Sequence, residues 1–268
     1  MPTERERERA QLNHVSLSVP DGGLVGIIGP NGSGKTTLLK VLGGLIRPWS
    51  GRVSIDGRDM SALTRRDLAR LIAIVPQETK LAFDYTALEV VLMGRYPHLG
   101  AFELEGRDDF AIATHSLDAT GTLPLAERVF DTLSGGEKQR VVIAGALAQS
   151  ARVMLLDEPT ASLDPGYQME IASLLRRLNS ERGVTMVVAT HDLNLAAGLC
   201  RELVLLRRGE VVAAGPTSGV LTRENIRNLY DLDAEVHYHE RAGHLTVVPI
   251  GRADSELGTR NLAHPPLP

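Results

Sequence analysis

A glycine-rich loop between an apolar run and a helical pattern constrains this chain more than any other feature. The apolar run is Leu24–Ile28, and the helical pattern begins at Thr36 and continues to Leu42. The loop matches Gly-x-x-x-x-Gly-Lys-Thr, which between a strand and a helix is typical of phosphate binding. Its residues are Gly29, Pro30, Asn31, Gly32, Ser33, Gly34, Lys35 and Thr36.

The residue types of this loop suit a nucleoside triphosphate with bound Mg²⁺. Its glycines allow successive backbone N–H groups to turn toward an anion, and the following helix adds the partial positive charge of its N-terminus. The amine of Lys35 can reach the β- and γ-phosphates, and the hydroxyl of Thr36 is a ligand for Mg²⁺. Thr37, the next residue, is assigned to the same site. A glycine-rich turn without function is the alternative, but it does not explain the full match in this context.

Composition and charge limit what can surround the loop. A chain of 268 residues, 43% of them hydrophobic, has room for one α/β domain with a small subdomain. Its formal net charge of −4 gives no basic field that would favour a nucleic acid partner. The single cysteine, Cys200, fits a reducing cytosol. No apolar run approaches the roughly 18 residues that span a bilayer, so at a membrane the chain would rely on the helices of another protein.

Two carboxylates follow a short, fully apolar run. Val153–Leu156 is typical of a central parallel strand, and Asp157 and Glu158 come directly after it. Carboxylates at the end of a buried strand are costly unless they are paired or bound to metal. We therefore interpret Asp157 as a Mg²⁺ ligand, direct or through water, and Glu158 as a general base for a water molecule.

Two further polar side chains follow predicted strands. Gln77 comes after Leu71–Val75, which Pro76 stops, and His191 lies just past Val184–Ala189. In open α/β sheets, ligands collect at the carboxyl ends of strands. The amide of Gln77 could therefore reach Mg²⁺ or the attacking water, and His191 could contact a γ-phosphate. An ordinary loop residue and a structural histidine are the alternatives, because position alone does not settle either role.

A second anion site is predicted where a helix begins after Ser134. Ser134 and Glu137 have the spacing of a capping box, in which each side chain accepts a hydrogen bond from the backbone of the other. Capping alone does not explain Gly135 and Gly136, because two glycines in a first turn cost helix stability. Their bare N–H groups at the helix N-terminus suit an anion. In the same helix Gly145 is a local weakness of about 1 kcal/mol relative to alanine.

The rest of the chain divides by pattern. Leu12–Val19 alternates apolar and polar residues, as a half-buried strand does. Helical spacing replaces this alternation between Glu78 and Thr132, which we interpret as an inserted helical segment. Two hairpins are predicted near the C-terminus. The second holds three histidines that could bind a metal, although the wet side of a strand is the favoured explanation: His237, His239 and His244.

Taken together, these residues resemble the motifs of the ATP-binding cassette ATPases in order and rough spacing. The resemblance covers about residues 12–215 and is far more specific than the phosphate loop alone. The matching segments are Gly29–Thr36 as Walker A, Gln77 as the Q-loop, Leu133–Glu137 as the signature, Val153–Glu158 as Walker B, Ser162–Asp164 as the D-loop and His191 as the switch histidine.

The resemblance implies a fold class and its boundaries. We expect an α/β P-loop NTPase core with a mixed or parallel sheet, an N-terminal antiparallel β subdomain, an inserted α-helical subdomain and a short C-terminal extension. The expected parts are a charged tail at 1–11, an ATPase domain at 12–215 with the helical subdomain inserted at 78–132, a C-terminal extension at 216–251 and a flexible tail at 252–268.

The mechanism of the family implies a head-to-tail dimer that holds two ATP molecules between its subunits. Each ATP would lie on the Lys35 loop of one copy, and the signature of a second copy would cover its γ-phosphate with Ser134, Gly135 and Gly136. The other implied roles are Mg²⁺ binding by Thr36, Asp157 and Gln77, polarisation of the attacking water by Glu158, contact with the γ-phosphate by His191 and communication across the interface by Asp164.

The segment Tyr85–Gly100 resembles the helical subdomain of importers for ferric siderophores, haem and cobalamin. In that branch this subdomain and the Q-loop receive a polytopic membrane permease, and a substrate-binding protein supplies the cargo. The chain would then be peripheral, at the cytoplasmic face of a bacterial plasma membrane, with no nucleic acid partner. The alternatives are another cargo, export, a cassette ATPase that acts on DNA or ribosomes, and a switch that binds ATP without turnover.

Two features depart from the family pattern. Relatives usually carry an aromatic residue that stacks on adenine near the first strand, whereas the residues before Leu12 are mostly glutamate and arginine. Loss of one base stack costs about 1–3 kcal/mol in nucleic acid complexes. Weaker ATP binding, a substitute residue or a non-native N-terminus would each account for this departure. Many relatives also carry arginine where this chain has Gly145, and we predict no consequence of that difference.

Overall fold

The computed structural model describes residues 12–253, which form two compact units. Unit 1 contains residues 12–17, 26–34 and 191–253, and unit 2 contains residues 18–25 and 35–190. The predicted tails at 1–11 and 252–268 lie outside the described residues, apart from Arg252 and Ala253. The chain passes from unit 1 into unit 2 at Lys35, so each unit contains part of the glycine-rich loop.

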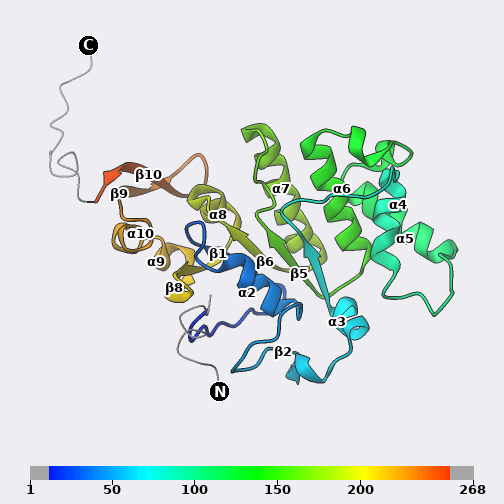
Figure 1. Cartoon of the computed structure of the whole chain (residues 1–268). Helices are drawn as coiled ribbons and strands as arrows, with labels where there is room; N and C mark the ends of the chain where they lie inside the picture. The colour runs from blue at the N-terminus through cyan, green and yellow to red at the C-terminus, as the bar shows by residue number, and fades with distance from the viewer. Residues whose placement is uncertain (1–11, 254–268) are drawn as a thin grey trace, which may run out of the picture. The chain divides into compact units, whose positions relative to one another are not determined.

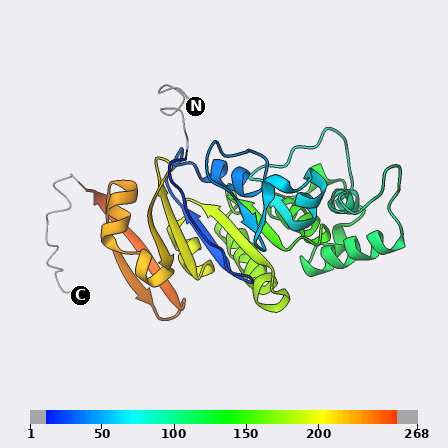
Figure 2. The same cartoon turned by 90° about the horizontal axis from the view of Figure 1, so that it is seen from below.

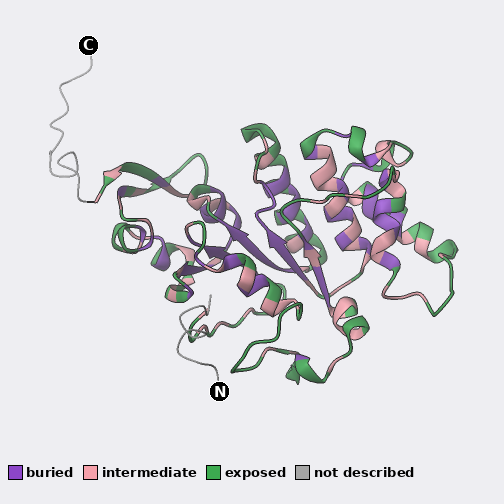
Figure 3. Cartoon of the chain, in the orientation of Figure 1, coloured by how far each residue is buried: buried purple, intermediate pink, exposed green. Residues whose placement is uncertain are grey.

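Unit 2 contains three neighbouring parallel strands, β4 (Ile72–Val75), β5 (Val153–Asp157) and β6 (Thr185–Thr190). β5 pairs with both of the others, with Val75 beside Leu156. Nearly all their residues are buried, as the purple of β5 and β6 in Figure 3 indicates. Burial on both faces is typical of parallel strands covered by helices. The three apolar runs therefore form strands as predicted, and their carboxyl ends share one edge.

Helices accompany these strands in unit 2. α2 contacts β5 and β6. α7 begins at Pro165, whose fixed φ suits a first helical position, and ends at Gly183 in the left-handed conformation. The bounds of these elements and of the short ones between α2 and β4 are α2 (Lys35–Leu42), β2 (Ser54–Ile55), β3 (Arg58–Asp59), η1 (Met60–Ala62), α3 (Arg65–Leu71) and α7 (Pro165–Arg182).

A group of helices lies between β4 and β5 in the chain, at the green end of unit 2 in Figure 1. Its core is apolar, with Val91, Leu117 and Phe130 fully buried. The buried guanidinium of Arg95 contacts Asp109 Oδ1 at 2.9 Å and donates to the carbonyl oxygen of Ala148 at 2.7 Å, which joins three segments. The elements are α4 (Ala87–Leu92), η2 (Met93–Arg95), α5 (Arg107–Ala119), η3 (Leu123–Leu125), η4 (Phe130–Thr132) and α6 (Gly135–Ala148).

Two glycines bring the backbone after α4 close to α6. A Cβ atom on Gly94 would lie 2.2 Å from the carbonyl oxygen of Gly145, so no larger residue fits there without a shift. A Cβ atom on Gly145 would lie 3.6 Å from the carbonyl oxygen of Val90, which is ordinary contact. A methyl group therefore fits at position 145, whereas it does not fit at position 94.

Unit 1 contains two antiparallel hairpins, as predicted for the C-terminal part of the chain. In one β7 (Glu202–Arg207) pairs with β8 (Glu210–Pro216), and in the other β9 (Leu232–His239) pairs with β10 (His244–Arg252). α10 packs against β9 (Figure 2), and α8 packs against β10. Arg252, predicted to begin the flexible tail, is the last residue of β10. The helices of this unit are α8 (Leu193–Leu199), α9 (Thr217–Val220) and α10 (Arg223–Tyr230).

The segment Leu12–Val19 is not part of a strand ladder and bends at His14, whose φ is +50°, so the strand predicted there is wrong. Its apolar residues are half-buried and its polar residues exposed, in the expected alternation. A strand also needs a neighbouring strand to which its backbone is hydrogen-bonded. Within the described residues, this segment donates one backbone hydrogen bond, from Asn13 N to Gly209 O at 2.8 Å. Antiparallel pairing in the N-terminal part is instead made by the short β2–β3 hairpin.

The contact between Gly94 and Gly145 predicts opposite effects of two alanine substitutions. We expect Gly94→Ala to destabilise the fold by about 1–3 kcal/mol, because its methyl group would overlap backbone. We expect Gly145→Ala to be neutral or to stabilise by up to about 1 kcal/mol, because a methyl group fits and alanine favours the helix. Urea unfolding of both variants checks this, and a Gly94→Ala protein as stable as the parent would contradict the packing described.

Candidate functional site

The glycine-rich loop follows β1 (Leu24–Ile28), whose residues are all buried. Within unit 1, a Cβ atom on Gly29 would lie 2.1 Å from the carbonyl oxygen of Leu206, so only glycine fits where the loop begins. Gly209 N donates to the carbonyl oxygen of Ser33 at 2.9 Å. Gly34 has a φ of +105°, which side chains rarely allow. Close packing and backbone conformation therefore explain these glycines, as expected for an anion-binding loop.

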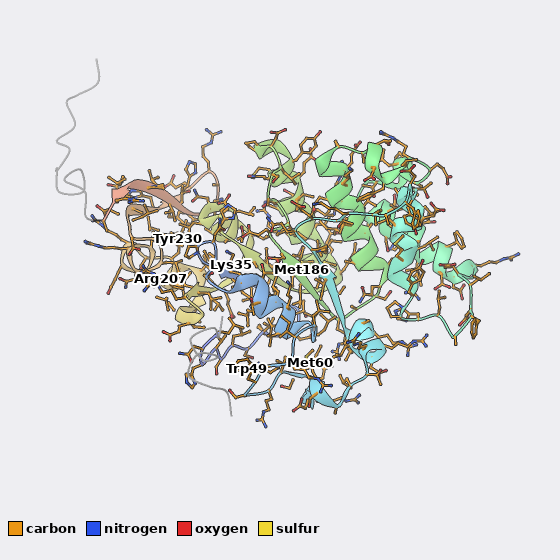
Figure 4. All side chains as sticks on the ribbon, viewed as in Figure 1. Lys35, Trp49, Met60, Met186, Arg207 and Tyr230 are labelled. Atoms are coloured by element: carbon orange, nitrogen blue, oxygen red, sulfur yellow. The ribbon has the colours of Figure 1, made fainter. Side chains whose placement is uncertain are left out.

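In unit 2 the loop continues into α2, where Lys35 is buried. Its Nζ lies 3.5 Å from Glu158 Oε1, and both side chains are less than 10% exposed. A buried charge is costly unless it is paired, and these two charges compensate each other. Figure 4 labels Lys35 at the start of α2. Thr36 is exposed and Thr37 is half-buried on the same first turn.

Asp157 is buried at the end of β5, and its carboxylate uses only part of its hydrogen-bonding capacity. Burial raises the pKa of its carboxyl group, and the neighbouring charge of Glu158 adds to that rise. A hydrogen bond from the hydroxyl of Thr36 and the positive charge of Lys35 act in the opposite direction. Its Oδ1 atom is buried without a hydrogen-bond partner. An orphaned carboxylate oxygen beside a threonine hydroxyl fits the all-oxygen coordination that Mg²⁺ prefers.

Glu158 leaves the strand with an unusual backbone. Its φ is +48°, a left-handed conformation that costs a non-glycine residue of order 1–2 kcal/mol. Its N–H donates to the carbonyl oxygen of Ala189 on β6 at 2.9 Å, and its own carbonyl accepts from Ala161 at 3.0 Å. The strained residue is thus fixed on both sides next to Lys35, as is common at functional sites.

Gln77 lies at the same strand edge as the two carboxylates. Because β4 and β5 are parallel with Val75 beside Leu156, Gln77 and Glu158 each come two residues after a paired position. The side chain of Gln77 is exposed. The register therefore agrees with the predicted position of this residue at the carboxyl edge.

The predicted signature helix begins with a complete capping box. Ser134 N donates to Glu137 Oε2 at 2.8 Å, and Ser134 Oγ accepts from Glu137 N at 3.4 Å. A backbone hydrogen bond from Ser134, together with one from its side chain, lowers the pKa of the Glu137 carboxyl group, so both groups of Ser134 serve the capping box. Ser134 and Gly135 are exposed at the surface, whereas Gly136 is buried.

Residues near the D-loop pack directly on the signature glycines, a contact that was not predicted. A Cβ atom on Gly136 would lie 2.5 Å from ring atom Cδ1 of Tyr167, and one on Gly135 would lie 3.3 Å from Leu163 Cδ2. Gly136 is therefore required by the position of the tyrosine ring. Asp164, between Leu163 and Tyr167, is the exposed N-cap residue of α7.

His191 belongs to unit 1 and directly follows Thr190, the last residue of β6 in unit 2. It is exposed. Its carbonyl oxygen accepts a hydrogen bond from the hydroxyl of Tyr230 at 3.1 Å. Sequence reasoning missed Tyr230, because the only signal is a tyrosine at the end of a predicted short helix.

His237, His239 and His244 are not arranged as a metal site. Within residues 12–253, no group of three or more histidine, cysteine or acidic side chains is arranged to hold a metal ion. His237 contacts Glu235 at 2.9 Å, His239 Nδ1 accepts from Ala242 N at 3.1 Å, and His244 Nδ1 lies 2.7 Å from the carbonyl oxygen of Leu245. The favoured explanation, polar residues on the wet side of a hairpin, agrees with these contacts.

The cluster of Lys35, Thr36, Asp157 and Glu158 at the carboxyl ends of parallel strands defines the class of a P-loop nucleotide-binding protein. The ABC transporter family model matches residues 12–161. The hemin import ATP-binding protein HmuV of Gloeobacter violaceus is 43% identical over 94% of this chain and 94% of its own length. The chain therefore belongs to the ABC transporter family, as the order of its motifs indicated.

Two further comparisons bear on fold and extent. The cobalamin import ATP-binding protein BtuD of Halobacterium salinarum is 44% identical over 89% of this chain, which spans only 60% of the length of that relative. An ATP-binding cassette solved as a dimer in a post-hydrolysis state with ADP and Pi is 36% identical, with a TM-score of 0.68 over 77% of this chain and 90% of that one. The predicted α/β cassette fold is confirmed. None of the described helices is long and apolar enough to cross a bilayer.

The environment of Asp157 predicts a conflict between stability and function. We expect Asp157→Asn to raise the thermal midpoint of the nucleotide-free protein, because a neutral amide avoids the cost of burying a carboxylate. The same change should lower the Mg²⁺ dependence of nucleotide binding. Differential scanning fluorimetry with and without Mg²⁺ and ATP checks both, with the exposed Asp118→Asn as control. A lower midpoint without nucleotide would contradict the electrostatic account.

Proposed function

We propose that this chain is the ATP-hydrolysing subunit of a membrane importer, with ferric siderophore, haem or cobalamin as the cargo. The observation that carries the proposal is the buried ion pair between Glu158 and Lys35, a residue of the glycine-rich loop. The unsatisfied carboxylate of Asp157 lies beside this pair. In this pair, Lys35 is a cation that can bind phosphate, and Glu158 is a carboxylate that can polarise water. The names of the relatives, which are hemin and cobalamin import proteins, support the importer and its cargo class.

In this proposal, binding of ATP separates the ion pair between Lys35 and Glu158. The amine of Lys35 binds the γ-phosphate, because a charge-assisted bond to phosphate replaces its bond to Glu158. The freed carboxylate of Glu158 then orients and polarises the attacking water. His191 would contact the γ-phosphate. The strained backbone of Glu158 keeps its carboxylate in place during the exchange.

Mg²⁺ is part of the proposal, because the donors present fit it. The hydroxyl of Thr36 and the orphaned oxygen of Asp157 would hold the ion, directly or through water, with Gln77 as a further oxygen donor. When bound, Mg²⁺ supplies charge neutralisation for the phosphates. The residues of the loop, Gly29 to Thr37, would hold the phosphates with backbone N–H groups and the Lys35 amine.

A second copy of the chain would complete each site. Ser134 and Gly135 are exposed at the N-terminus of α6, and the N–H groups of its first turn suit an anion. In a head-to-tail dimer this helix end would face the γ-phosphate on the partner copy, and Asp164 would communicate across the interface. Support comes from the related cassette, whose structure is dimeric.

The remaining partners follow from the importer proposal. A polytopic permease would dock at the helical subdomain, 78–132, inserted in an ATPase domain of 12–215, and the C-terminal extension would be 216–251. A substrate-binding protein would supply the cargo indirectly. The chain would be peripheral at the cytoplasmic face of the bacterial plasma membrane. Exposed apolar side chains on the helical subdomain, among them Phe102 and Leu104, support a docking role.

Transport of another cargo or export is the second candidate, and a cassette acting on DNA or ribosomes is the weaker one. The net charge of −4 provides no basic surface for nucleic acid. A switch that binds ATP without turnover is disfavoured, because Gln77, Glu158 and His191 form a complete hydrolytic set. The relatives named above are import proteins, which favours import over export.

We expect Glu158→Gln to retain ATP binding and to lose nearly all turnover. Glutamine preserves the size and hydrogen-bonding ability of the side chain but cannot accept a proton from water. The variant should accumulate as an ATP-bound dimer in size-exclusion chromatography. Hydrolysis at a rate near that of the parent protein would remove Glu158 from the role of general base.

We expect Lys35→Ala to lose most ATP affinity and also some stability, because it deletes the phosphate contact and leaves Glu158 as an unpaired buried charge. Equilibrium binding of a fluorescent ATP analogue and the thermal midpoint measure the two effects. Lys40→Ala, an exposed lysine in the last turn of the same helix, serves as control. Unchanged nucleotide binding in Lys35→Ala would count against the whole loop assignment.

The importer proposal is tested by ATPase activity of the chain co-purified with its membrane partner in lipid vesicles. Binding protein loaded with haem, a ferric siderophore or cobalamin is added in turn. Stimulation by one of them supports import and identifies the cargo class. If a polytopic partner co-purifies and none of the three stimulates hydrolysis, the cargo assignment fails. If no membrane partner can be found, the transport proposal fails.

A further inference from the structure

The C-terminal extension has no part in the mechanism above, yet it contacts the segment that carries His191. Tyr230, the last residue of α10, donates its hydroxyl proton to the carbonyl oxygen of His191 at 3.1 Å. Both residues belong to unit 1. Tyr230 is half-buried, and its hydrogen bond helps to hold the backbone of the exposed His191 in one position.

The end of α10 is itself held firmly. Arg207, at the end of β7, donates to the carbonyl oxygen of Asn228 and to Asp231 Oδ2, the latter at 2.6 Å. The buried side chains of Ile226 and Leu229 pack the helix against its neighbours. Tyr230 therefore projects from a fixed base, with Arg207 close to it in Figure 4. A mobile tyrosine could not hold His191, whereas this one can.

The chain after His191 is held by the same extension. The side chain of Asn194, in the first turn of α8, accepts from Val247 N at 2.7 Å and donates to Val247 O at 3.2 Å on β10. Asp192 caps α8 by accepting from Asn194 N and Leu195 N at 2.9 Å each. The extension thus restrains His191 at its own carbonyl and again three residues later.

The same helix end also lies against the glycine-rich loop. A hollow of about 230 Å³ is lined by residues 30–33 of the loop and by Arg207, Arg208, Leu229, Tyr230 and Asp231. All of these residues belong to unit 1. The end of α10 is therefore next to two parts of the proposed hydrolytic site, the loop and the histidine.

We propose that Tyr230 is a positioning residue for His191, so that the C-terminal extension is part of the hydrolytic machinery. This inference rests on the proposed function, in which His191 contacts the γ-phosphate. The hydroxyl of Tyr230 fixes the peptide that follows the His191 side chain and so limits the directions in which the imidazole can point. A phosphate contact made mainly during transfer depends strongly on such alignment.

The test is Tyr230→Phe in the full-length chain, which removes one hydroxyl and retains the ring. We expect kcat for ATP hydrolysis to fall about three- to tenfold, as for the loss of one positioning hydrogen bond, with KM for ATP and the thermal midpoint unchanged. Tyr238→Phe, an exposed tyrosine on β9 of the same extension, is the matched control and should change none of the three. An unchanged kcat in Tyr230→Phe, or equal changes in both variants, overturns the inference.

Two further variants separate this inference from the proposed function. His191→Ala should lose most turnover, and adding Tyr230→Phe to it should lower kcat no further, because the positioned group is already absent. If His191→Ala retains the parental kcat, the proposed role of His191 fails, and the role of Tyr230 fails with it. If His191→Ala loses turnover but Tyr230→Phe lowers kcat further in that background, Tyr230 acts elsewhere and only the inference on Tyr230 is overturned.

Discussion

The charges buried at the carboxyl end of β5 are the constraint on which the rest of this site depends. Lys35 and Glu158 compensate each other, whereas one oxygen of Asp157 has no hydrogen-bond partner. Such charges are tolerated only where a rigid framework prevents relaxation. The parallel strands and the helices beside them supply that framework. A phosphate with its cation would relieve the remaining cost of these buried charges.

The first turn of α6 adds a second constraint, and in the proposed function it covers the γ-phosphate bound to a second copy. The capping box joins Ser134 and Glu137 in both directions and leaves Ser134 and Gly135 exposed. Tyr167 fills the space above Gly136 and so requires a residue without a side chain. Two glycines in the first turn of a helix carry a cost in stability. It is explained if a second copy presents its phosphate there.

Local patterns predicted the elements that bear this chemistry. The apolar runs before Gln77 and Asp157, and the loop before Lys35, identify their own structures because neighbouring residues determine them. Leu12–Val19 had the correct alternation but lacked a pairing partner, which no local pattern reports. The contacts of Tyr167 and Tyr230 were not predicted for the same reason, because they join residues that are far apart in sequence. Sequence therefore predicted the chemical groups, and the structure added what positions them.

The central claim is that each ATP site is shared between two copies, and mixing two inactive variants tests it directly. Copies with Lys35→Ala lack a working loop, and copies with Ser134→Arg lack a working signature, so neither hydrolyses ATP alone. In a mixed dimer, the intact loop of one copy meets the intact signature of the other and forms one complete site. The account predicts that hydrolysis returns on mixing. Activity no greater than the sum of the two separate variants would contradict it.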